Sequence, residues 1–190
     1  MRERLASLLR PEVPLALLVL LRVIAGCELF VQGNDKLRQG YFDRISPGDT
    51  EVSHPLQIRL KVWIEEERQV SVRGRDGAII KQPVRMFRWY RFFLENAVLP
   101  NVRIFAILVS VGEITLGAML MVGLLTRVAS FLGILLLINY LFATWHYGFP
   151  YLPFNTLFLG VLVVALIAPV GRSLGIDSLL HEQYPEIPLF

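Results

Sequence analysis

Two side chains of opposite charge lie inside the first two long apolar runs of this chain. Arg22 is in Val13–Gln32, and Glu113 is in Val102–Leu125. About 20 apolar residues are enough to cross a bilayer. An ionised side chain at that depth costs roughly 2.5–3.5 kcal/mol on insertion scales, so it normally faces inward and has a partner. We therefore predict that Arg22 and Glu113 pair in a polar interior, where the pair either locks the helices together or takes part in chemistry.

Further polar side chains fall in the half of the predicted helices nearer the outside. They are Glu28, Asn139, His146 and Asn155. Polar groups of this kind orient a ligand within mostly apolar walls, so with Arg22 and Glu113 they predict a pocket that opens outward. Two of them have simpler explanations. Asn139 is also typical of a contact between membrane helices, and His146 beside Trp145 is also typical of an anchor at the membrane surface.

The composition of the whole chain indicates a membrane protein. Of its 190 residues, 54% are hydrophobic and 18% are charged, whereas a soluble domain has about 25% charged residues. We expect one membrane domain over residues 1–190, with the lipid bilayer as its surroundings. The net charge of +3 is not gathered on a nucleic-acid-binding fold, so we predict no nucleic-acid partner. The lone Cys27 allows no intrachain disulfide, and no His, Cys and carboxylate set has the spacing of a metal site.

Four apolar segments predict an all-α integral membrane protein with a bundle of four transmembrane helices. The third segment is Val128–Thr144 and the fourth is Phe154–Val170. Short flanks rich in Lys and Arg normally face the cytoplasm. The arginines in such flanks are Arg2, Arg4, Arg10, Arg127 and Arg172. Since the connection from Trp145 to Pro153 has neither Lys nor Arg, we expect both termini to be cytoplasmic.

The long loop between the first two helices, residues 34–101, is predicted to lie outside the cell and to carry a small β element. Apolar residues alternate from Ile58 to Ile64, which is typical of a strand; a helix running through Glu65–Glu67 is the alternative. A β-hairpin is expected over residues 70–80. Residues 84–100 are rich in Arg and aromatic side chains and predict an interfacial helix among the lipid headgroups, or a helix packed on the small sheet.

The N-terminal segment has a second interpretation as a cleaved secretory signal. A basic start and an apolar run lead to Ile24-Ala25-Gly26-Cys27, which resembles a lipoprotein processing site. Arg22 interrupts the apolar region close to that site, which is unfavourable for a signal peptide. We therefore expect the first helix to be retained.

The charged residues stand in motifs that resemble those of the DoxX/DoxD family. The first helix and its continuation read LLRVIAG and FVQGNDKL, the second helix reads GEITLGAMLMVGLLTR, and the C-terminal part reads GRSLGIDSLL. The residues that match the family pattern are Arg22, Gly33, Lys36, Glu113, Gly117, Arg127, Arg172 and Asp177. The resemblance implies a four-helix protein of the prokaryotic cytoplasmic (inner) membrane, associated with redox chemistry of sulfur compounds and the quinone pool.

The resemblance includes the small DoxD-type subunit of thiosulfate:quinone oxidoreductase. It implies a membrane subunit of a quinone-linked oxidoreductase, acting on thiosulfate or another sulfur compound, with quinone as the cofactor. Arg22 would stabilise the reduced quinone and Glu113 would relay a proton, while Glu28, Asn139, His146 and Asn155 would bind the head group. The sequence has no dinucleotide-binding, haem or iron–sulfur motif, so electrons would come from a partner chain or a small reductant.

Two other functions fit the same sequence. The chain could be a non-catalytic assembly subunit that docks a partner protein through the long loop, with Arg22 and Glu113 purely architectural. A small transporter or cargo receptor is the third function, and it is disfavoured because the sequence offers neither inverted repeats nor a helix break at mid-membrane.

Overall fold

The computed structural model describes residues 15–41, 55–65, 68–73, 79–147, 151–168 and 175–183. Some predictions fall outside these residues. They concern the hairpin tip at residues 74–77, the N-terminal arginines, the start of the signal-like segment and Arg172. Within them, three helical stretches are long and apolar enough to cross a membrane, namely Ala16–Arg38, Arg88–Val122 and Thr126–Tyr147. A fourth apolar helix is shorter.

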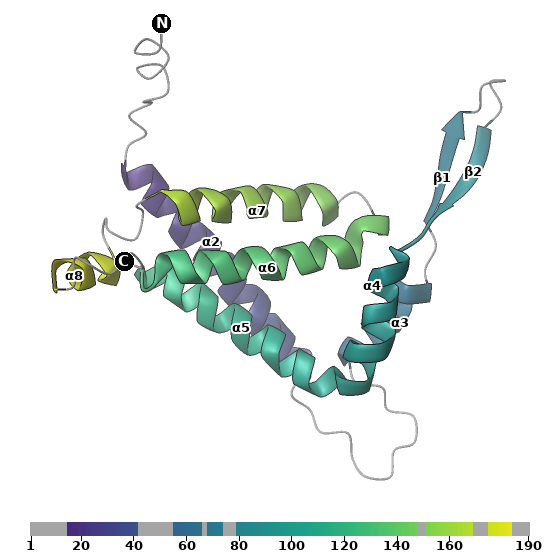
Figure 1. The fold of residues 1–190 in the computed structure, drawn as a ribbon, viewed down its shortest axis with the longest axis horizontal. Helices are drawn as coiled ribbons and strands as arrows, with labels where there is room; N and C mark the ends of the chain where they lie inside the picture. The colour runs from purple at the N-terminus through teal and green to yellow at the C-terminus, as the bar shows by residue number, and fades with distance from the viewer. Residues whose placement is uncertain are drawn as a thin grey trace, which may run out of the picture.

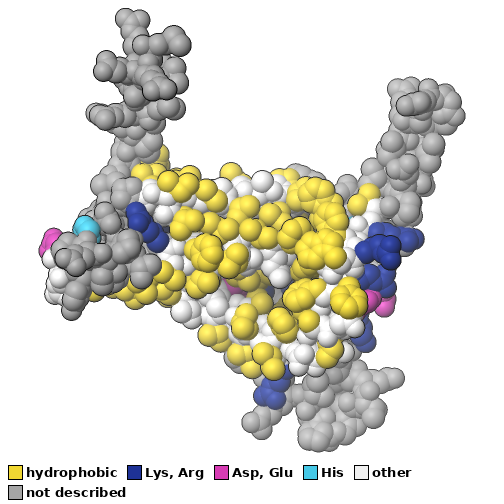
Figure 2. Space-filling view, in the orientation of Figure 1, with side chains coloured by type: hydrophobic (Ala, Val, Ile, Leu, Met, Phe, Trp, Pro, Cys, Tyr) yellow, Lys and Arg dark blue, Asp and Glu magenta, His cyan; other side chains and the backbone are white. Residues whose placement is uncertain are grey.

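The four apolar helices pack as two antiparallel pairs. Helix α2 (Leu15–Arg38) packs along α5 (Val102–Val122), and α6 (Thr126–Thr144) packs along α7 (Tyr151–Ile167) (Figure 1). Their shared core consists of Ala25, Leu29, Leu116, Leu120, Ala129, Leu137, Phe158 and Leu162. Many outward-facing side chains are also apolar (Figure 2), as expected for helices that have lipid as their solvent.

The remaining elements lie at the two ends of this bundle. The loop end carries α3 (Pro55–Glu65), the paired strands β1 (Arg68–Arg73) and β2 (Ile79–Val84), and α4 (Arg88–Phe93) (Figure 1). A π-helical turn (Leu94–Val98) and a 3-10 turn (Leu99–Asn101) connect α4 to α5, and another 3-10 turn (Trp145–Tyr147) follows α6. The opposite end, here called the terminus end, carries the start of α2 and helix α8 (Ile176–Gln183). Which end faces the cytoplasm stays a prediction.

The prediction of a strand over Ile58–Ile64 is wrong, because this segment is part of helix α3. Only two of the alternating residues, Leu60 and Ile64, pack inward. Leu56, Leu60 and Trp63 recur at helical spacing and pack with α4 in a second core cluster, in which Leu60 is only 4% exposed. Ile58 and Val62 are exposed instead. Sequence alternation was therefore fortuitous, and the helical alternative is correct up to Glu65.

The aromatic segment after β2 packs by one face and leaves the other uncovered. Tyr90 and Leu94 are buried in the cluster that α4 forms with α3 and with Ala143 at the end of α6. Trp89 and Phe92 remain exposed, at 57% and 67%. This arrangement suits a helix whose exposed rings enter a lipid surface, although its depth in the membrane stays a prediction.

Candidate functional site

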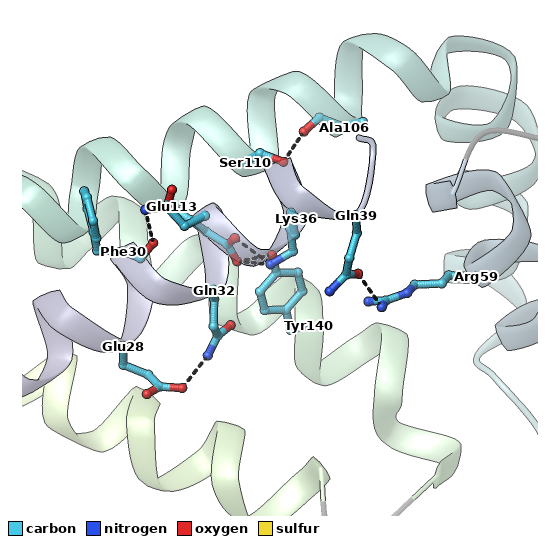
Figure 3. Close-up of polar contacts among 11 residues, drawn as sticks. Glu28, Phe30, Gln32, Lys36, Gln39, Arg59, Ala106, Ser110, Glu113 and Tyr140 are labelled. Atoms are coloured by element: carbon cyan, nitrogen blue, oxygen red, sulfur yellow. Dashed lines mark hydrogen bonds and ion pairs between the residues drawn. The ribbon is translucent and has the colours of Figure 1, made fainter. Parts of the chain in front are cut away.

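The centre of the candidate site is a buried ion pair between α2 and α5. The Glu113 carboxylate is fully buried, and the Lys36 ammonium lies 2.6 Å from Oε1 and 2.5 Å from Oε2. The hydroxyl of Tyr140, from α6, donates a hydrogen bond of 2.5 Å to Oε1 (Figure 3). A buried carboxylate is tolerated when it has an oppositely charged partner and additional hydrogen bonds. Three helices thus meet at one satisfied polar network within an apolar bundle.

The predicted pairing of Arg22 with Glu113 is wrong. Arg22 is 2% exposed, and its guanidinium lies against Gly123, where a β-carbon would collide with it. Gly123 is ten residues from Glu113, which corresponds to about 15 Å along a helix. Helix α2 crosses α5 with Gly26 against Gly117. In this antiparallel register the residues that precede Gly26 lie level with the end of α5, so Arg22 is far from Glu113.

Arg22 belongs instead to a second polar cluster at the terminus end. Its charge interacts with that of Asp177, which is 1% exposed. The two Asp177 carboxylate oxygens accept hydrogen bonds from the backbone N–H groups of Leu125 (2.6 Å) and Thr126 (2.8 Å). Asp177 therefore caps the N-terminus of α6 from outside, and its own N–H donates to the Gly123 carbonyl at 2.8 Å. This arrangement attaches α8 to the α5–α6 turn.

A cavity of about 1030 Å³ adjoins the Lys36–Glu113 pair. It is enclosed mainly by α5 and α6, with α3 and α4 at its loop end. Most of its walls are apolar, and several of them, including Leu108 and Leu135, are also exposed on the lipid-facing surface. Figure 2 shows this apolar face with a hollow in it. The cavity is therefore accessible to an apolar ligand that arrives through the bilayer.

Polar groups are concentrated at one end of this cavity. Those that line it there are Lys36, Tyr41, Arg59, Tyr90, Asn139 and Tyr140. The Tyr90 hydroxyl donates a 2.8 Å hydrogen bond to the Asn139 side-chain oxygen. Burial raises the pKa of Tyr41, and the neighbouring Arg59 charge offsets this in part. Tyr41 therefore stays neutral at physiological pH, which leaves Lys36 and Arg59 as the charges on the cavity surface among the described residues.

Only part of the predicted ligand-binding set comes together. Asn139 lines the cavity, whereas Glu28, His146 and Asn155 are not among the described lining residues. Glu28 accepts a 2.9 Å hydrogen bond from Gln32 on its own helix, apart from the ion pair (Figure 3). Asn155 donates to Thr144 of α6 at 3.3 Å. His146 is buried at the end of α6, with its ring 4.3 Å from that of Tyr147.

The candidate site also contains five residues that the sequence did not predict as part of it. They are Lys36, Tyr140, Tyr41, Tyr90 and Arg59. Lys36 was visible as a motif residue, but the first apolar run ends at Gln32, whereas α2 continues to Arg38. A long lysine stem lets the ammonium reach back along a membrane helix. Tyr140 follows Asn139 directly, and only the rotation of α6 shows which of the two faces Glu113. Among the described residues, no three His, Cys, Asp or Glu side chains gather as metal ligands would.

The comparison with known families agrees with this architecture. Residues 85–146 match the family model DoxX. The match supports a DoxX-family membrane protein. It runs from α4 through α6 and so includes Glu113, Tyr140 and most of the cavity wall, whereas Lys36 lies before it. Neither a search of curated proteins nor a search of solved structures found a match.

The family match and the apolar helices together indicate a multi-pass membrane protein. DoxX proteins are commonly membrane-associated and linked to oxidoreductase-related functions. In this chain, the features suited to such a role are the cavity that opens on the apolar face and the charged network at its polar end.

Proposed function

We propose that this chain is a DoxD-type membrane subunit of a quinone-linked oxidoreductase, and that the quinone head group binds at the polar end of the cavity. The observation that carries the proposal is the position of Lys36 and Tyr140, which line an apolar cavity beside the buried Glu113. Ligand pockets typically have volumes of about 300–1,000 Å³ and a few polar groups within apolar walls. A quinone, with its polar head and long apolar tail, has the matching chemistry.

The network supplies what a quinone head needs during its reaction. Reduction to the quinol adds two electrons to the conjugated ring system and one proton to each of the two carbonyl oxygens. The Lys36 ammonium stabilises negative charge on the nearer oxygen, the role that the family resemblance implied for Arg22. Glu113 holds Lys36 and Tyr140 in place and exchanges protons with them. The electrons come from outside this chain, from a partner subunit at the loop end or from a small reductant such as thiosulfate or another sulfur compound.

The proposal includes the placement of the chain in the bilayer. Helices α2, α5, α6 and α7 cross the cytoplasmic membrane of a prokaryote, the terminus end faces the cytoplasm, and the loop end faces outward. This placement puts the polar end of the cavity in the outer half of the membrane. The exposed rings of Trp89 and Phe92 then lie near the outer headgroups or against the partner subunit.

Titration of the purified protein with a quinone analogue tests this proposal. We expect Glu113→Gln and Lys36→Met to raise the Kd at least about tenfold, because a hydrogen bond to a charged group contributes about 1.5–3 kcal/mol. Glu28→Gln is the matched control, since Glu28 is a carboxylate on α2 outside the cavity lining, and it should leave the Kd unchanged.

A folded native chain that binds no quinone analogue would contradict the proposal. It would favour the alternative in which the chain is a non-catalytic assembly subunit. The exposed aromatic face of α4, with Trp89 and Phe92, is the observation that supports that second function.

A further inference from the structure

The Glu113 carboxylate is shut off from the terminus end by close helix packing. A β-carbon on Gly117 would lie 2.6 Å from the Gly26 carbonyl oxygen, so the two backbones are in direct contact at this level. Around this crossing, Ala25, Leu29 and Leu120 are buried and apolar. Dry apolar packing of this kind leaves no room for water. Ser130 of α6 is also buried next to this core, and its hydroxyl makes no hydrogen bond within the described part of the chain.

Toward the loop end, the surroundings of Glu113 are polar. Lys36 stands in the last turn of α2, and its side chain is 15% exposed although its ammonium contacts the fully buried carboxylate. Beyond it, Gln39 and Arg59 are exposed and joined by a 2.6 Å hydrogen bond from Nη2 to Oε1. Figure 3 shows these side chains following one another from Glu113 toward α3. The Lys36 side chain thus contacts the buried Glu113 carboxylate and is also partly exposed at the polar loop end of the bundle.

We propose that Lys36 is the proton-exchanging residue of the cavity, and that it connects Glu113 only with the loop end. The Lys36 ammonium passes a proton to Glu113 or to an anionic ligand oxygen, and the resulting amine takes a proton from water at the loop end. Applied to quinone, which rests on the proposed function, two protons enter from the loop end for each quinone reduced by two electrons. The reverse reaction releases two protons there.

The charges around Glu113 are consistent with this direction of transfer. Lys36 approaches from α2, Tyr140 and Asn139 line the cavity from α6, Tyr90 lines it from α4, and Arg59 lines it from α3. Tyr41, just after α2, completes the set. All the charged groups among them are cationic, and the described lining residues of the cavity include no carboxylate. The charges on the lining therefore favour an anionic ligand at this end of the cavity.

The test measures protonation of Glu113 from each side of a membrane. The full chain is reconstituted in vesicles with uniform orientation, and an acid pulse is applied to one face at a time. Infrared difference spectra follow the C=O band of the protonated carboxyl group, which is assigned by its absence in Glu113→Gln. Orientation is established in separate samples by membrane-impermeant thiol labelling of Lys61→Cys, on exposed α3, and Glu182→Cys, on exposed α8, each with Cys27→Ser.

We expect the band to appear promptly after a pulse at the loop end and to stay absent after a pulse at the terminus end. Lys36→Met should lose the prompt response, whereas Lys61→Met, which changes an exposed lysine of α3 outside the cavity lining, should keep it. A response from the terminus end, from both ends equally or from neither would overturn the inference. The comparison of the two faces uses the native chain, so it stands even where Lys36→Met fails to fold.

The outcome separates this inference from the proposed function. The infrared measurement needs no quinone, and quinone binding is measured independently in the titration described above. A loop-end response together with no quinone binding would remove the proposed function and keep the proton path. Quinone binding together with a terminus-end response would keep the proposed function and remove the proton path.

Discussion

Replacing Lys36 with methionine is expected to lower the free energy of unfolding in detergent by about 3–5 kcal/mol, because loss of one partner leaves a buried charge uncompensated. Methionine keeps most of the length of the apolar stem and removes only the ammonium. The remaining carboxylate of Glu113 is fully buried and would keep only its hydrogen bond from Tyr140. Denaturant unfolding followed by tryptophan fluorescence measures the loss.

Two further variants show whether the loss comes from the ion pair. Lys61→Met, on the exposed face of α3, should change the stability by less than about 0.5 kcal/mol, as surface substitutions usually do. The double variant Lys36→Met with Glu113→Gln should recover much of the loss, because no buried charge is then left alone. Equal losses for Lys36→Met and Lys61→Met would show that the pair contributes nothing to stability.

Replacing Gly117 with alanine is expected to disrupt the contact between α2 and α5. The added β-carbon would lie 2.6 Å from the Gly26 carbonyl oxygen and from the Phe30 backbone nitrogen. Both are backbone atoms, so the helices themselves must separate. Overpacking of this kind typically destabilises by about 1–3 kcal/mol, and sometimes by more. Thermal unfolding in detergent should show a clearly lower midpoint.

Gly112→Ala is the matched control for this prediction. Gly112 lies on the same helix, and a β-carbon there would meet nothing within 4 Å. The substitution should be neutral or slightly stabilising, because alanine has the higher helix propensity. Similar midpoints for Gly117→Ala and Gly112→Ala would contradict the close crossing of α2 and α5, and with it the register that separates Arg22 from Glu113.

The positions of the apolar helices could be predicted from the sequence because lipid imposes a simple requirement. A helix in a bilayer needs a long apolar run, and backbone groups there must be paired within the segment. The predicted run Val128–Thr144 differs from α6 by two residues at its start, and Val102–Leu125 differs from α5 by three at its end. The first run was cut short at Gln32 because the polar residues up to Arg38 continue the helix beyond the apolar part.

The partners of the charged residues could not be predicted in the same way. Glu113 was correctly singled out as a residue of the polar interior, but its partner depends on where α2 crosses α5. That register is set by Gly26 against Gly117, a relation between helices that no local pattern contains. The reach of the Lys36 side chain adds a second non-local element, since its ammonium contacts Glu113 from the last turn of α2.

The motif residues acquire separate physical roles in the fold. Lys36, Glu113 and Gly117 lie at the contact of α2 with α5, and Lys36 also lines the cavity. Arg22 and Asp177 lie at the terminus end, around Gly123. The first group is where we place the chemistry, and the second fixes the α5–α6 turn and α8. A single sequence pattern therefore contains one candidate site and one structural cluster.

Photolabelling with a quinone that carries a light-activated group on its ring tests the central claim most directly. Mass spectrometry of the labelled protein should find the label on the polar end of the cavity, at residues such as Tyr90, Asn139 or Tyr140. Excess unlabelled quinone should abolish this labelling, and Glu113→Gln should weaken it strongly. Label found instead on lipid-facing α7, at residues such as Leu157, and not displaced by excess quinone would contradict a quinone site in this cavity.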